Sequence, residues 1–423
     1  GEKIEVGETA VCNLGSINLK NHVKPVYSTR TEPITKEKYQ HLLRYEVDWK
    51  EIETSVKLAR RILDNVIDLN FYPTKESKKS NMRHRPVGLG VMGLHDMLHL
   101  LDIQIDSDEA IEFNDQLFEA ISMNAIEAGA DLAEERGAYP SYEGSLWSKD
   151  IMPIDTWKTF LDYRGSYPED AHECLTDNVG KLTDDWKRVR AKIAKHGMRN
   201  SLSMAIAPTA TIGDINGVEQ SIEPNPSVLF VKENKSGNFY IVNEYFIEDM
   251  REAGLWNPQF ADAVRAVDGD VESLAIPDKL KEKYASVRNR DMMKLIQCNA
   301  ARQKWIDQAI SFNVYYFGSS SKDINDIYMA AWEYGLKTTY YLRGTGASKI
   351  EKTTVNTGEM NLDNRVQRDG SVIHSTEQMP DKADKFAGYT PVDESKVQQE
   401  AGSPDASCSL AALMRGEICE SCE

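Results

Sequence analysis

The composition of the chain changes abruptly at Gly344, and this change limits what the polypeptide can fold into. Residues 344–423 contain only two aromatic side chains, Phe386 and Tyr389, among many Asp, Glu, Lys, Gln, Ser and Thr. Such a segment cannot bury enough apolar surface to offset the conformational entropy that ordering would cost. We therefore expect the folded core to lie within residues 1–343 and the rest to form a flexible tail.

Residues 1–343 alternate helical patterns with short apolar runs, which is typical of an α/β protein. Apolar side chains recur at helical spacing from Trp49 to Asn70, and Ser107 and Gly137 are typical residues for the start and end of another helix. The predicted elements are helices over 49–70, 107–137, 183–196, 299–311 and 321–334, and extended segments over 8–19, 201–207, 228–231 and 336–342.

The charge balance and the cysteine count exclude several classes of protein. The chain has 67 acidic and 50 basic residues, a net charge of −17, and a pI near 5.1. This argues against extended contact with a nucleic-acid backbone, because each neutralised phosphate needs a Lys or Arg. No apolar run is long enough for a membrane helix, and the first residues lack the features of a signal peptide. Six cysteines in a chain of this length do not form a disulfide framework, so we expect a cytoplasmic protein.

Two local motifs resemble well-known sites without the context that those sites need. Gly88–Gly93 matches the dinucleotide fingerprint G-x-G-x-x-G, but the preceding residues, Lys78–Pro86, are not a buried strand. His95–His99 resembles the zinc motif H-E-x-x-H, but its acid is Asp96, which is shorter than Glu, and no third ligand follows. We expect close backbone packing at the glycines, two partly buried histidines, and no metal site.

Cys419 and Cys422 form a C-x-x-C pair close to the C-terminal end of the sequence. Their spacing permits a disulfide, and exposure would permit exchange with another thiol pair. Two other interpretations are half of a zinc site and incidental cysteines. A zinc site with four ligands needs two more, and Cys408 is the only candidate in the tail.

Three further features permit chemistry but also have ordinary structural explanations. The adjacent Tyr340 and Tyr341 could pass on an oxidising equivalent and a proton, or could be strand residues with one ring in the core and one outside. Cys12 lies in an apolar run, where a cysteine is usually inert packing. Backbone N–H groups and hydroxyls at a turn between a strand and a helix could bind a phosphate, or the turn could simply start a helix. That turn is Pro208-Thr209-Ala210-Thr211-Ile212.

Taken together and in this order, these motifs resemble those of the catalytic (large, alpha) subunit of class I ribonucleotide reductase. The tyrosine pair favours class I over the cobalamin-dependent class. The resemblance implies that residues 1–343 form the second half of a ten-stranded α/β barrel and that residues 344–423 are a tail ending in a redox C-x-x-C. The matching stretches are Val11–Leu19, His196–Ser201, Ala207–Ile212, Asn216–Glu219, Glu223–Pro224, Trp305–Ser311, Lys337–Tyr341 and Cys419–Cys422.

The resemblance also implies the reaction, which converts ribonucleoside diphosphates to 2′-deoxyribonucleotides by thiyl-radical chemistry. Cys12 would be one of two active-site thiols that reduce the ribose and end as a disulfide. Cys419 and Cys422 would reduce that disulfide again, and thioredoxin or glutaredoxin would then reset them.

Two further roles follow from the same resemblance. Tyr340 and Tyr341 would relay a radical that arrives from a metal-containing small subunit. The turn Pro208–Ile212 would hold the phosphates of the ribonucleotide substrate through its backbone N–H groups. The resemblance implies no metal ligand and no cofactor bound directly by this chain.

One departure from the family pattern is large. The radical-bearing cysteine of the family lies in an Asn-Leu-Cys-x-Glu motif, which is absent here, and the order around Cys12 is Cys-Asn-Leu. The second redox cysteine and the sites for allosteric nucleotides would belong to a missing N-terminal half. We therefore expect a split subunit that needs a separate N-terminal half through an extensive interface. The alternative is a non-catalytic redox or zinc-binding interaction protein that works through its tail C-x-x-C.

Overall fold

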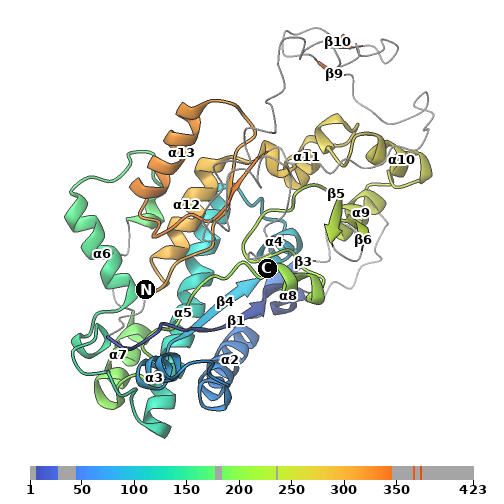
Figure 1. Ribbon diagram of the computed structural model, residues 1–423. Helices are drawn as coiled ribbons and strands as arrows, with labels where there is room; N and C mark the ends of the chain where they lie inside the picture. The colour runs from blue at the N-terminus through green and yellow to red at the C-terminus, as the bar shows by residue number, and fades with distance from the viewer. Residues whose placement is uncertain are drawn as a thin grey trace, which may run out of the picture. The chain divides into compact units, whose positions relative to one another are not determined.

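The computed structural model describes residues 6–26, 44–176, 183–234, 237–344, 365–366 and 372–373 (Figure 1). The chain divides into two units, 1–363 and 364–423. In the second unit, the described residues are the short antiparallel strands β9 (Arg365–Val366) and β10 (Val372–Ile373). All further structure described below belongs to the first unit.

The first unit alternates helices and strands. Its helices are α2 (Trp49–Leu69), α3 (Lys75–His84), α4 (Leu94–Leu101), α5 (Asp108–Arg136), α6 (Pro153–Arg164), α7 (Asp184–His196), α8 (Ala210–Asn216), α9 (Glu244–Glu252), α10 (Pro258–Ala266), α11 (Asp278–Tyr284), α12 (Met292–Gln303) and α13 (Ser321–Glu333). Its strands are β1 (Asn13–Asn18), β2 (Val23–Val26), β3 (Arg44–Val47), β4 (Val87–Met92), β5 (Leu229–Asn234), β6 (Gly237–Val242), β7 (Val314–Tyr315) and β8 (Leu342–Arg343).

Five extended segments lie side by side in parallel. β1 pairs with β4, and a parallel bridge joins Leu89 of β4 to Met204. A second parallel bridge joins Ile206 to Ile310, and β7 pairs in parallel with β8. We call these segments the parallel array, which consists in order of β1, β4, 203–206, 309–315 and 340–343.

The order of the segments in the parallel array follows their order in the chain, and each connection contains at least one helix. Parallel strands need such crossover connections, so the predicted α/β class is confirmed. Helix α2, which follows β1, packs against both β1 and β4 (Figure 1). Five parallel segments are the number that one half of a ten-stranded barrel requires.

Helices with clear local signals begin and end close to where the sequence predicts them. This holds for α2, α5, α7 and α13. In α5, the Ser107 hydroxyl accepts a hydrogen bond from the N–H of Ala110, and Gly137 ends the helix with a φ of +82°. Glycine adopts this left-handed conformation without a steric cost.

Two predicted elements are wrong. The helix expected over 299–311 lies instead at Met292–Gln303, because the chain after it joins the parallel array. There the N–H of Gln308 donates to the Met204 carbonyl, and that of Ser311 donates to the Ile206 carbonyl. The strand expected over 336–342 is only the pair Leu342–Arg343.

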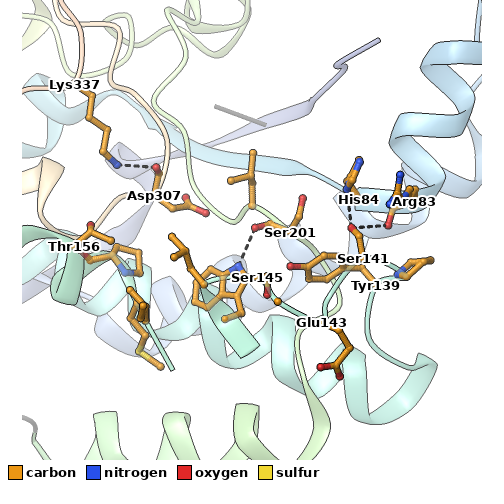
Figure 2. A pocket seen from close by; sticks show the side chains of 18 residues that line it. Arg83, His84, Tyr139, Ser141, Glu143, Ser145, Thr156, Ser201, Asp307 and Lys337 are labelled. Carbon is orange, nitrogen blue, oxygen red and sulfur yellow. Dashed lines mark hydrogen bonds between the residues drawn. The ribbon is translucent and has the colours of Figure 1, made fainter. Parts of the chain in front are cut away.

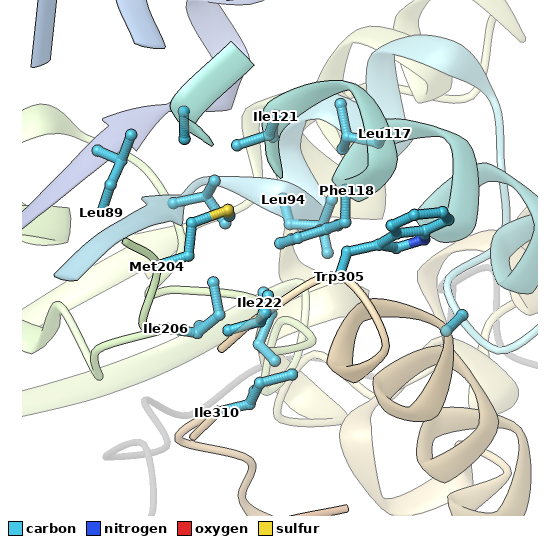
Figure 3. Packing of buried hydrophobic residues seen from close by; sticks show 14 of the residues in the cluster. Leu89, Leu94, Leu117, Phe118, Ile121, Met204, Ile206, Ile222, Trp305 and Ile310 are labelled. Atoms are coloured by element: carbon cyan, nitrogen blue, oxygen red, sulfur yellow. The ribbon is translucent and has the colours of Figure 1, made fainter. Parts of the chain in front are cut away.

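The main core lies between the parallel array and α5 (Figure 3). Leu89, Met204, Ile206 and Ile310 project from the array towards apolar side chains of α5 and towards Trp305. The residues of α5 in this core include Leu117, Phe118 and Ile121, each fully buried. A second, smaller apolar cluster involves β5 and α9 to α11.

Gly88 and Gly90 of the glycine motif lie within β4, which is buried at every residue, and Gly93 directly precedes α4. A Cβ at Gly90 would overlap the carbonyl oxygen of Ala205, and a Cβ at Gly88 would lie 3.0 Å from the Cβ of Ala205. The glycines therefore let two segments of the parallel array approach each other. The expected close backbone packing is confirmed.

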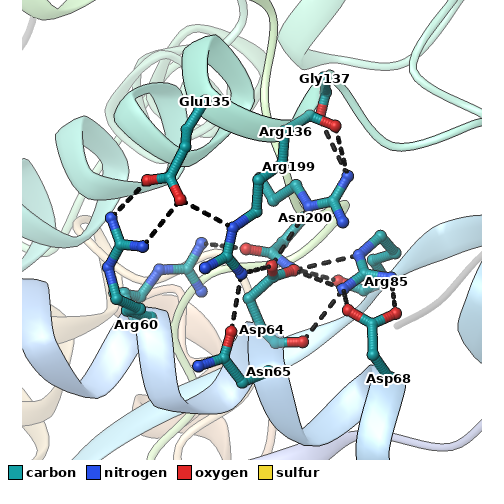
Figure 4. A network of polar contacts seen from close by, with 11 residues as sticks. Arg60, Asp64, Asn65, Asp68, Arg85, Glu135, Arg136, Gly137, Arg199 and Asn200 are labelled. Carbon is teal, nitrogen blue, oxygen red and sulfur yellow. Dashed lines mark hydrogen bonds and ion pairs between the residues drawn. The ribbon is translucent and has the colours of Figure 1, made fainter.

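A buried carboxylate holds α2 against the segments around it (Figure 4). Asp64 is fully buried, and one of its oxygens accepts two hydrogen bonds from Arg85, of 2.8 and 3.0 Å. The other oxygen accepts from Arg136 at 3.0 Å and from Arg199 at 3.2 Å. We call Asp64, Arg85, Arg136 and Arg199 the arginine cluster. It joins α2 to the C-terminal end of α5 and to residues just before β4 and before segment 203–206.

Candidate active site

Cys12 directly precedes β1, and its side chain is exposed. The thiol lies 3.8 Å from Oε1 of Gln308, whose Nε2 donates to the Val87 carbonyl at 2.9 Å. The thiol is therefore held at an accessible position where β1, β4 and the start of segment 309–315 meet. This is not the inert core packing that is usual for a lone cysteine.

The other two described cysteines have different surroundings. Cys298 is fully buried and Cys174 is half-buried. Burial raises the pKa of each thiol to about 12. Because the thiolate is the reactive form, burial disfavours reaction at both positions, and Cys12 is the exposed thiol among the described residues.

Tyr340 and Tyr341 lie against each other. Their ring centroids are 4.0 Å apart with an interplanar angle of 49°, and the Tyr340 hydroxyl donates to the Tyr341 hydroxyl at 3.2 Å. Tyr340 is 46% exposed and Tyr341 is 38% exposed. The alternative of one ring in the core and one outside is wrong, because both rings are exposed and regular strand geometry begins only at Leu342.

The tyrosine pair is fixed to segment 309–315 through the backbone. The N–H of Tyr340 donates to the Phe312 carbonyl at 2.7 Å, and the N–H of Tyr341 donates to Oδ1 of Asn313 at 3.2 Å. The N–H of Val314 donates in turn to the Tyr341 carbonyl at 2.8 Å. Cys12 contacts Gln308, the residue directly before this segment, so the thiol and the phenols are supported by one continuous stretch of chain.

The residues just before the tyrosine pair are fixed by Lys337. Its ammonium group donates to the carbonyls of Ile306 and Asp307, at 2.9 and 2.7 Å. Burial lowers the pKa of Lys337. The Asp307 carboxylate accepts hydrogen bonds from the N–H groups of Ser203 and Met204 at 2.7 and 2.8 Å. Three neighbouring segments of the parallel array are thereby joined where they begin.

A pocket of about 850 Å³ lies at this end of the parallel array (Figure 2). His84, Ser201, Asp307 and Lys337 line it, and each of them precedes a segment of the array. Trp147 also lines the pocket, and its indole N–H donates to the Ser201 carbonyl at 2.8 Å. The pocket therefore has aromatic, cationic and carboxylate groups in its lining.

The turn Pro208–Ile212 begins α8, as predicted. Thr209 precedes the helix with a φ of +51°, in the left-handed region that few residues other than glycine adopt. Its hydroxyl oxygen accepts a hydrogen bond of 2.7 Å from the N–H of Ser221. Residues 210–212 are exposed. The N–H groups in the first turn of a helix have no acceptor within the helix, so they are available for another acceptor.

His95 and His99 are both buried, and their rings stack with centroids 4.1 Å apart. Burial lowers the pKa of His95 well below its usual value and that of His99 to about 3, so both are neutral. Nδ1 of His95 accepts from the N–H of Asn225 at 2.7 Å, and Nε2 of His99 donates to Oδ1 of Asn225 at 2.9 Å. We expected two partly buried histidines, and both are buried almost completely. No group of three His, Cys, Asp or Glu side chains that could hold a metal ion occurs in the described ranges.

Two glutamates have raised pKa values, and the sequence did not predict either of them as a site residue. Burial raises the pKa of Glu219 to about 8 and that of Glu223 to about 7. Glu223 accepts hydrogen bonds from the Tyr315 hydroxyl at 2.7 Å and from the N–H of Asn313 at 3.2 Å. The one feature of the sequence that pointed to these residues is that both lie in stretches resembling the family, Asn216–Glu219 and Glu223–Pro224. Nothing in their spacing indicates burial.

The structure therefore brings Cys12 and the tyrosine pair onto a common support and places the turn Pro208–Ile212 at the carboxyl end of segment 203–206. Cys419 and Cys422 lie outside the described residues. Among the described helices, none is both long enough and apolar enough to span a membrane.

Comparison with known proteins gives a consistent result. The family model for the ribonucleotide reductase barrel domain matches residues 2–342. The chain is 44% identical to the ribonucleoside-diphosphate reductase subunit alpha of Chlamydia pneumoniae over 369 residues, which cover 87% of this chain and 33% of that protein. It is 35% identical to the large subunit from Caenorhabditis elegans over 88% of this chain and 43% of that protein. It is also 36% identical to the large chain from Schizosaccharomyces pombe, over 82% of this chain and 38% of that protein. The chain thus spans between a third and less than half of the length of these relatives.

Proposed function

Because the chain belongs to the family of ribonucleotide reductase barrel domains, we propose that it is the C-terminal part of the catalytic subunit of a ribonucleoside-diphosphate reductase. In this proposal, residues 1–343 contribute half of the catalytic barrel, and residues 344–423 form the tail with the redox pair Cys419 and Cys422. The observation that carries the proposal is the contact between the hydroxyls of Tyr340 and Tyr341 on the same support as an exposed cysteine.

Cys12 is proposed to be one of two thiols that reduce the substrate. The ribose 2′ hydroxyl leaves as water, a hydrogen takes its place, and the two thiols lose two electrons and two protons to become a disulfide. The other thiol and the radical-bearing cysteine would come from the N-terminal half of the subunit. The exposure of Cys12 and the position of Gln308 beside it support this role, since the thiol must reach both a substrate and a second sulfur.

Tyr340 and Tyr341 are proposed to relay an oxidising equivalent from a metal-containing small subunit. A phenol that gives up an electron must also release its proton, and a neighbouring hydroxyl can accept that proton. The hydrogen bond of 3.2 Å between the two hydroxyls and the partial exposure of both rings support such a relay from a partner into the protein.

The turn Pro208–Ile212 is proposed to hold the phosphates of the ribonucleotide. Its support is the position after segment 203–206, since α/β proteins bind ligands beyond the carboxyl ends of their strands. The exposed first residues of α8 also support it, because helix N-termini attract anions.

The further partners in this proposal are the N-terminal half of the catalytic subunit, the small subunit, and thioredoxin or glutaredoxin. Allosteric nucleotides would bind the N-terminal half. The compartment would be the cytoplasm, where thiols are kept reduced. No observation on the described residues favours the alternative of a redox or zinc-binding interaction protein.

The test is reduction of a ribonucleoside diphosphate by the chain combined with the N-terminal part of the subunit and the small subunit. We expect Cys12→Ser and Tyr341→Phe each to lower the rate by on the order of 100-fold or more, which corresponds to a barrier increase of about 2.7 kcal/mol. Serine cannot form the disulfide, and phenylalanine has no hydroxyl proton to release.

Two variants serve as matched controls. Tyr163→Phe removes a hydroxyl from a residue that is 90% exposed, and Cys174→Ser changes a thiol whose pKa burial raises. Both should keep the wild-type rate. Full activity in both Cys12→Ser and Tyr341→Phe would contradict the assignments.

A further inference from the structure

The polar side chains of the His95–His99 motif are buried and are connected by hydrogen bonds to the turn Pro208–Ile212. Residues 218–225, which follow α8, contact both the motif and the turn. They pass next to the residues where β4 ends and α4 begins. We call residues 218–225 the return segment. The following inference rests on the proposed function, because it concerns how the substrate phosphates are held.

Backbone N–H groups at the start of α4 form hydrogen bonds with carbonyls of the return segment. The N–H of Gly93 donates to the Glu219 carbonyl at 2.9 Å, and that of Leu94 donates to the Ser221 carbonyl at 3.4 Å. Gly93 has a φ of +70°, and a Cβ there would lie 3.1 Å from the Cβ of Val218. The close fit requires glycine at this position, since any side chain would meet both strain and crowding.

Asp96 adds the side-chain contact at this junction. It is 7% exposed, and its Oδ2 accepts a hydrogen bond of 2.7 Å from the N–H of Glu219. Its Oδ1 accepts from the Tyr245 hydroxyl at 3.1 Å. Both oxygens are engaged within the protein, so Asp96 binds no ligand itself. It fixes the backbone of the return segment at Glu219.

The histidines fix the far end of the same segment. Asn225 is bound on both sides, since its N–H donates to His95 and its side-chain oxygen accepts from His99. Its Nδ2 donates to Oε2 of Glu219 at 2.7 Å. The residues of the motif on α4 thus hold the return segment at Glu219 and at Asn225.

The return segment in turn holds the turn Pro208–Ile212. The N–H of Ser221, two residues after Glu219, donates to the Thr209 hydroxyl at 2.7 Å. Thr209 and Ser221 both have left-handed backbones, with φ of +51° and +50°. Such conformations persist only where the surroundings fix them. The path from Asp96 to the turn is therefore two hydrogen bonds and three residues of chain.

We propose that Asp96 is a positioning residue that sets the phosphate-binding turn through the N–H of Glu219 and the bond from Ser221 to Thr209. Loss of this carboxylate leaves the N–H of Glu219 without its acceptor, so the return segment shifts there although the bonds from Gly93 and Asn225 remain, and Thr209 relaxes from its left-handed conformation. The first N–H groups of α8 then point away from the phosphates. Phosphate affinity falls, whereas contacts to the ribose and base persist.

The test compares two ligands on the complete catalytic subunit, a ribonucleoside diphosphate and the matching ribonucleoside without phosphates. We expect Asp96→Ala to raise the Kd of the diphosphate about tenfold, equivalent to about 1.4 kcal/mol, and to leave the Kd of the ribonucleoside within about twofold. In turnover, KM should rise by the same factor while kcat changes little. A merely structural role would weaken both ligands equally.

Two further variants make the test specific. Asp96→Asn can still accept from Glu219 with its oxygen and donate to Tyr245 with its nitrogen, so it should restore most of the diphosphate affinity. Tyr245→Phe removes the other contact of Asp96 and should leave both Kd values close to wild type. Thr209→Val has a similar shape but no acceptor for Ser221, and it should reproduce the loss seen in Asp96→Ala, which keeps the test open if Asp96→Ala does not fold.

The proposed function and the role of Asp96 are refuted by different results. If the wild-type subunit neither binds nor reduces the diphosphate, the proposed function is wrong. If the wild type does both, and the diphosphate Kd is unchanged in Asp96→Ala and Thr209→Val, the function stands and the role of Asp96 is refuted.

Discussion

Two buried polar clusters in this protein differ in how their ionisable side chains respond to burial. In the arginine cluster, the fully buried Asp64 is surrounded by three guanidinium groups. In the second cluster, around His95, His99, Glu219 and Glu223, burial shifts each pKa towards the neutral form. Burial disfavours charge in both places, and the available partners decide whether the charge remains.

The difference in charge between the two clusters corresponds to a difference in which parts of the protein they contact. The arginine cluster joins α2 to three other parts of the fold, and none of the candidate site residues belongs to it. The second cluster is connected to the turn Pro208–Ile212 through the return segment, and to segment 309–315 through Glu223. We therefore expect mutations in the first cluster to change stability at every pH, and mutations in the second to act in a way that depends on pH.

The largest effect is expected for Asp64→Ala. Removal of this carboxylate leaves the side chain of Arg85, which is 4% exposed, without its buried partner. Breaking a buried ion pair in this way costs about 3–5 kcal/mol of unfolding free energy. Urea denaturation followed by circular dichroism measures this directly. A loss below about 1 kcal/mol would show that the arginine cluster is not the anchor described here.

An intermediate effect that depends on pH is expected for Glu223→Gln. The pKa of Glu223 is raised from 4.5 to about 7, so the neutral form is favoured in the folded protein. Its contribution to stability is fully present below pH 4.5 and is lost as the pH rises through about 7. Glutamine stays neutral, can accept from the N–H of Asn313 and can donate to the Tyr315 oxygen.

The measurement is the urea midpoint of both proteins between about pH 5 and about pH 8.5. Above the pKa of Glu223, we expect Glu223→Gln to be more stable than wild type by on the order of 1–3 kcal/mol, and the gap should close at the acid end. A gap that is the same at every pH would mean that Glu223 does not titrate in this range.

The smallest effect is expected for Asp68→Asn, which is the matched control for Asp64. Asp68 lies one turn further along α2 and binds the same Arg85, at 2.8 Å, but its side chain is 44% exposed. Exposed ion pairs contribute about 0–1 kcal/mol because water and salt screen them. The same urea experiment should show a change within this range. A loss as large as that of Asp64→Ala would remove the distinction between buried and exposed charge.

Local signals in the sequence predicted the helices that begin and end at strong caps. Ser107 and Gly137 limit α5 through contacts within a few residues, so the prediction needs no knowledge of the fold. The misplaced helix over 299–311 shows the opposite case. The conformation of Gln308 and Ser311 is set by carbonyls about a hundred residues away, which no local pattern reports.

The candidate site also has some features that local sequence predicts and others that it does not. The place of Pro208–Ile212 at a helix start follows from the sequence of the turn. The roles proposed for Cys12 and the tyrosine pair came from the family resemblance, since an isolated cysteine or tyrosine pair favours ordinary packing. The contact of Asp96 with Glu219 joins residues 123 positions apart. Only the folded chain could reveal it.

The absence of a side chain at Gly88 also affects the packing beside the Cys12 thiol. A Cβ at position 88 would lie 3.5 Å from Sγ of Cys12 and 2.5 Å from Cδ2 of Leu14. Because the glycine has no side chain, Leu14 of β1 and Ala205 of the next segment fill this volume from either side, and the Cys12 thiol lies at an ordinary van der Waals distance from it. The first glycine of a motif that resembles a nucleotide fingerprint thus admits side chains from the two neighbouring segments of the parallel array, next to the thiol.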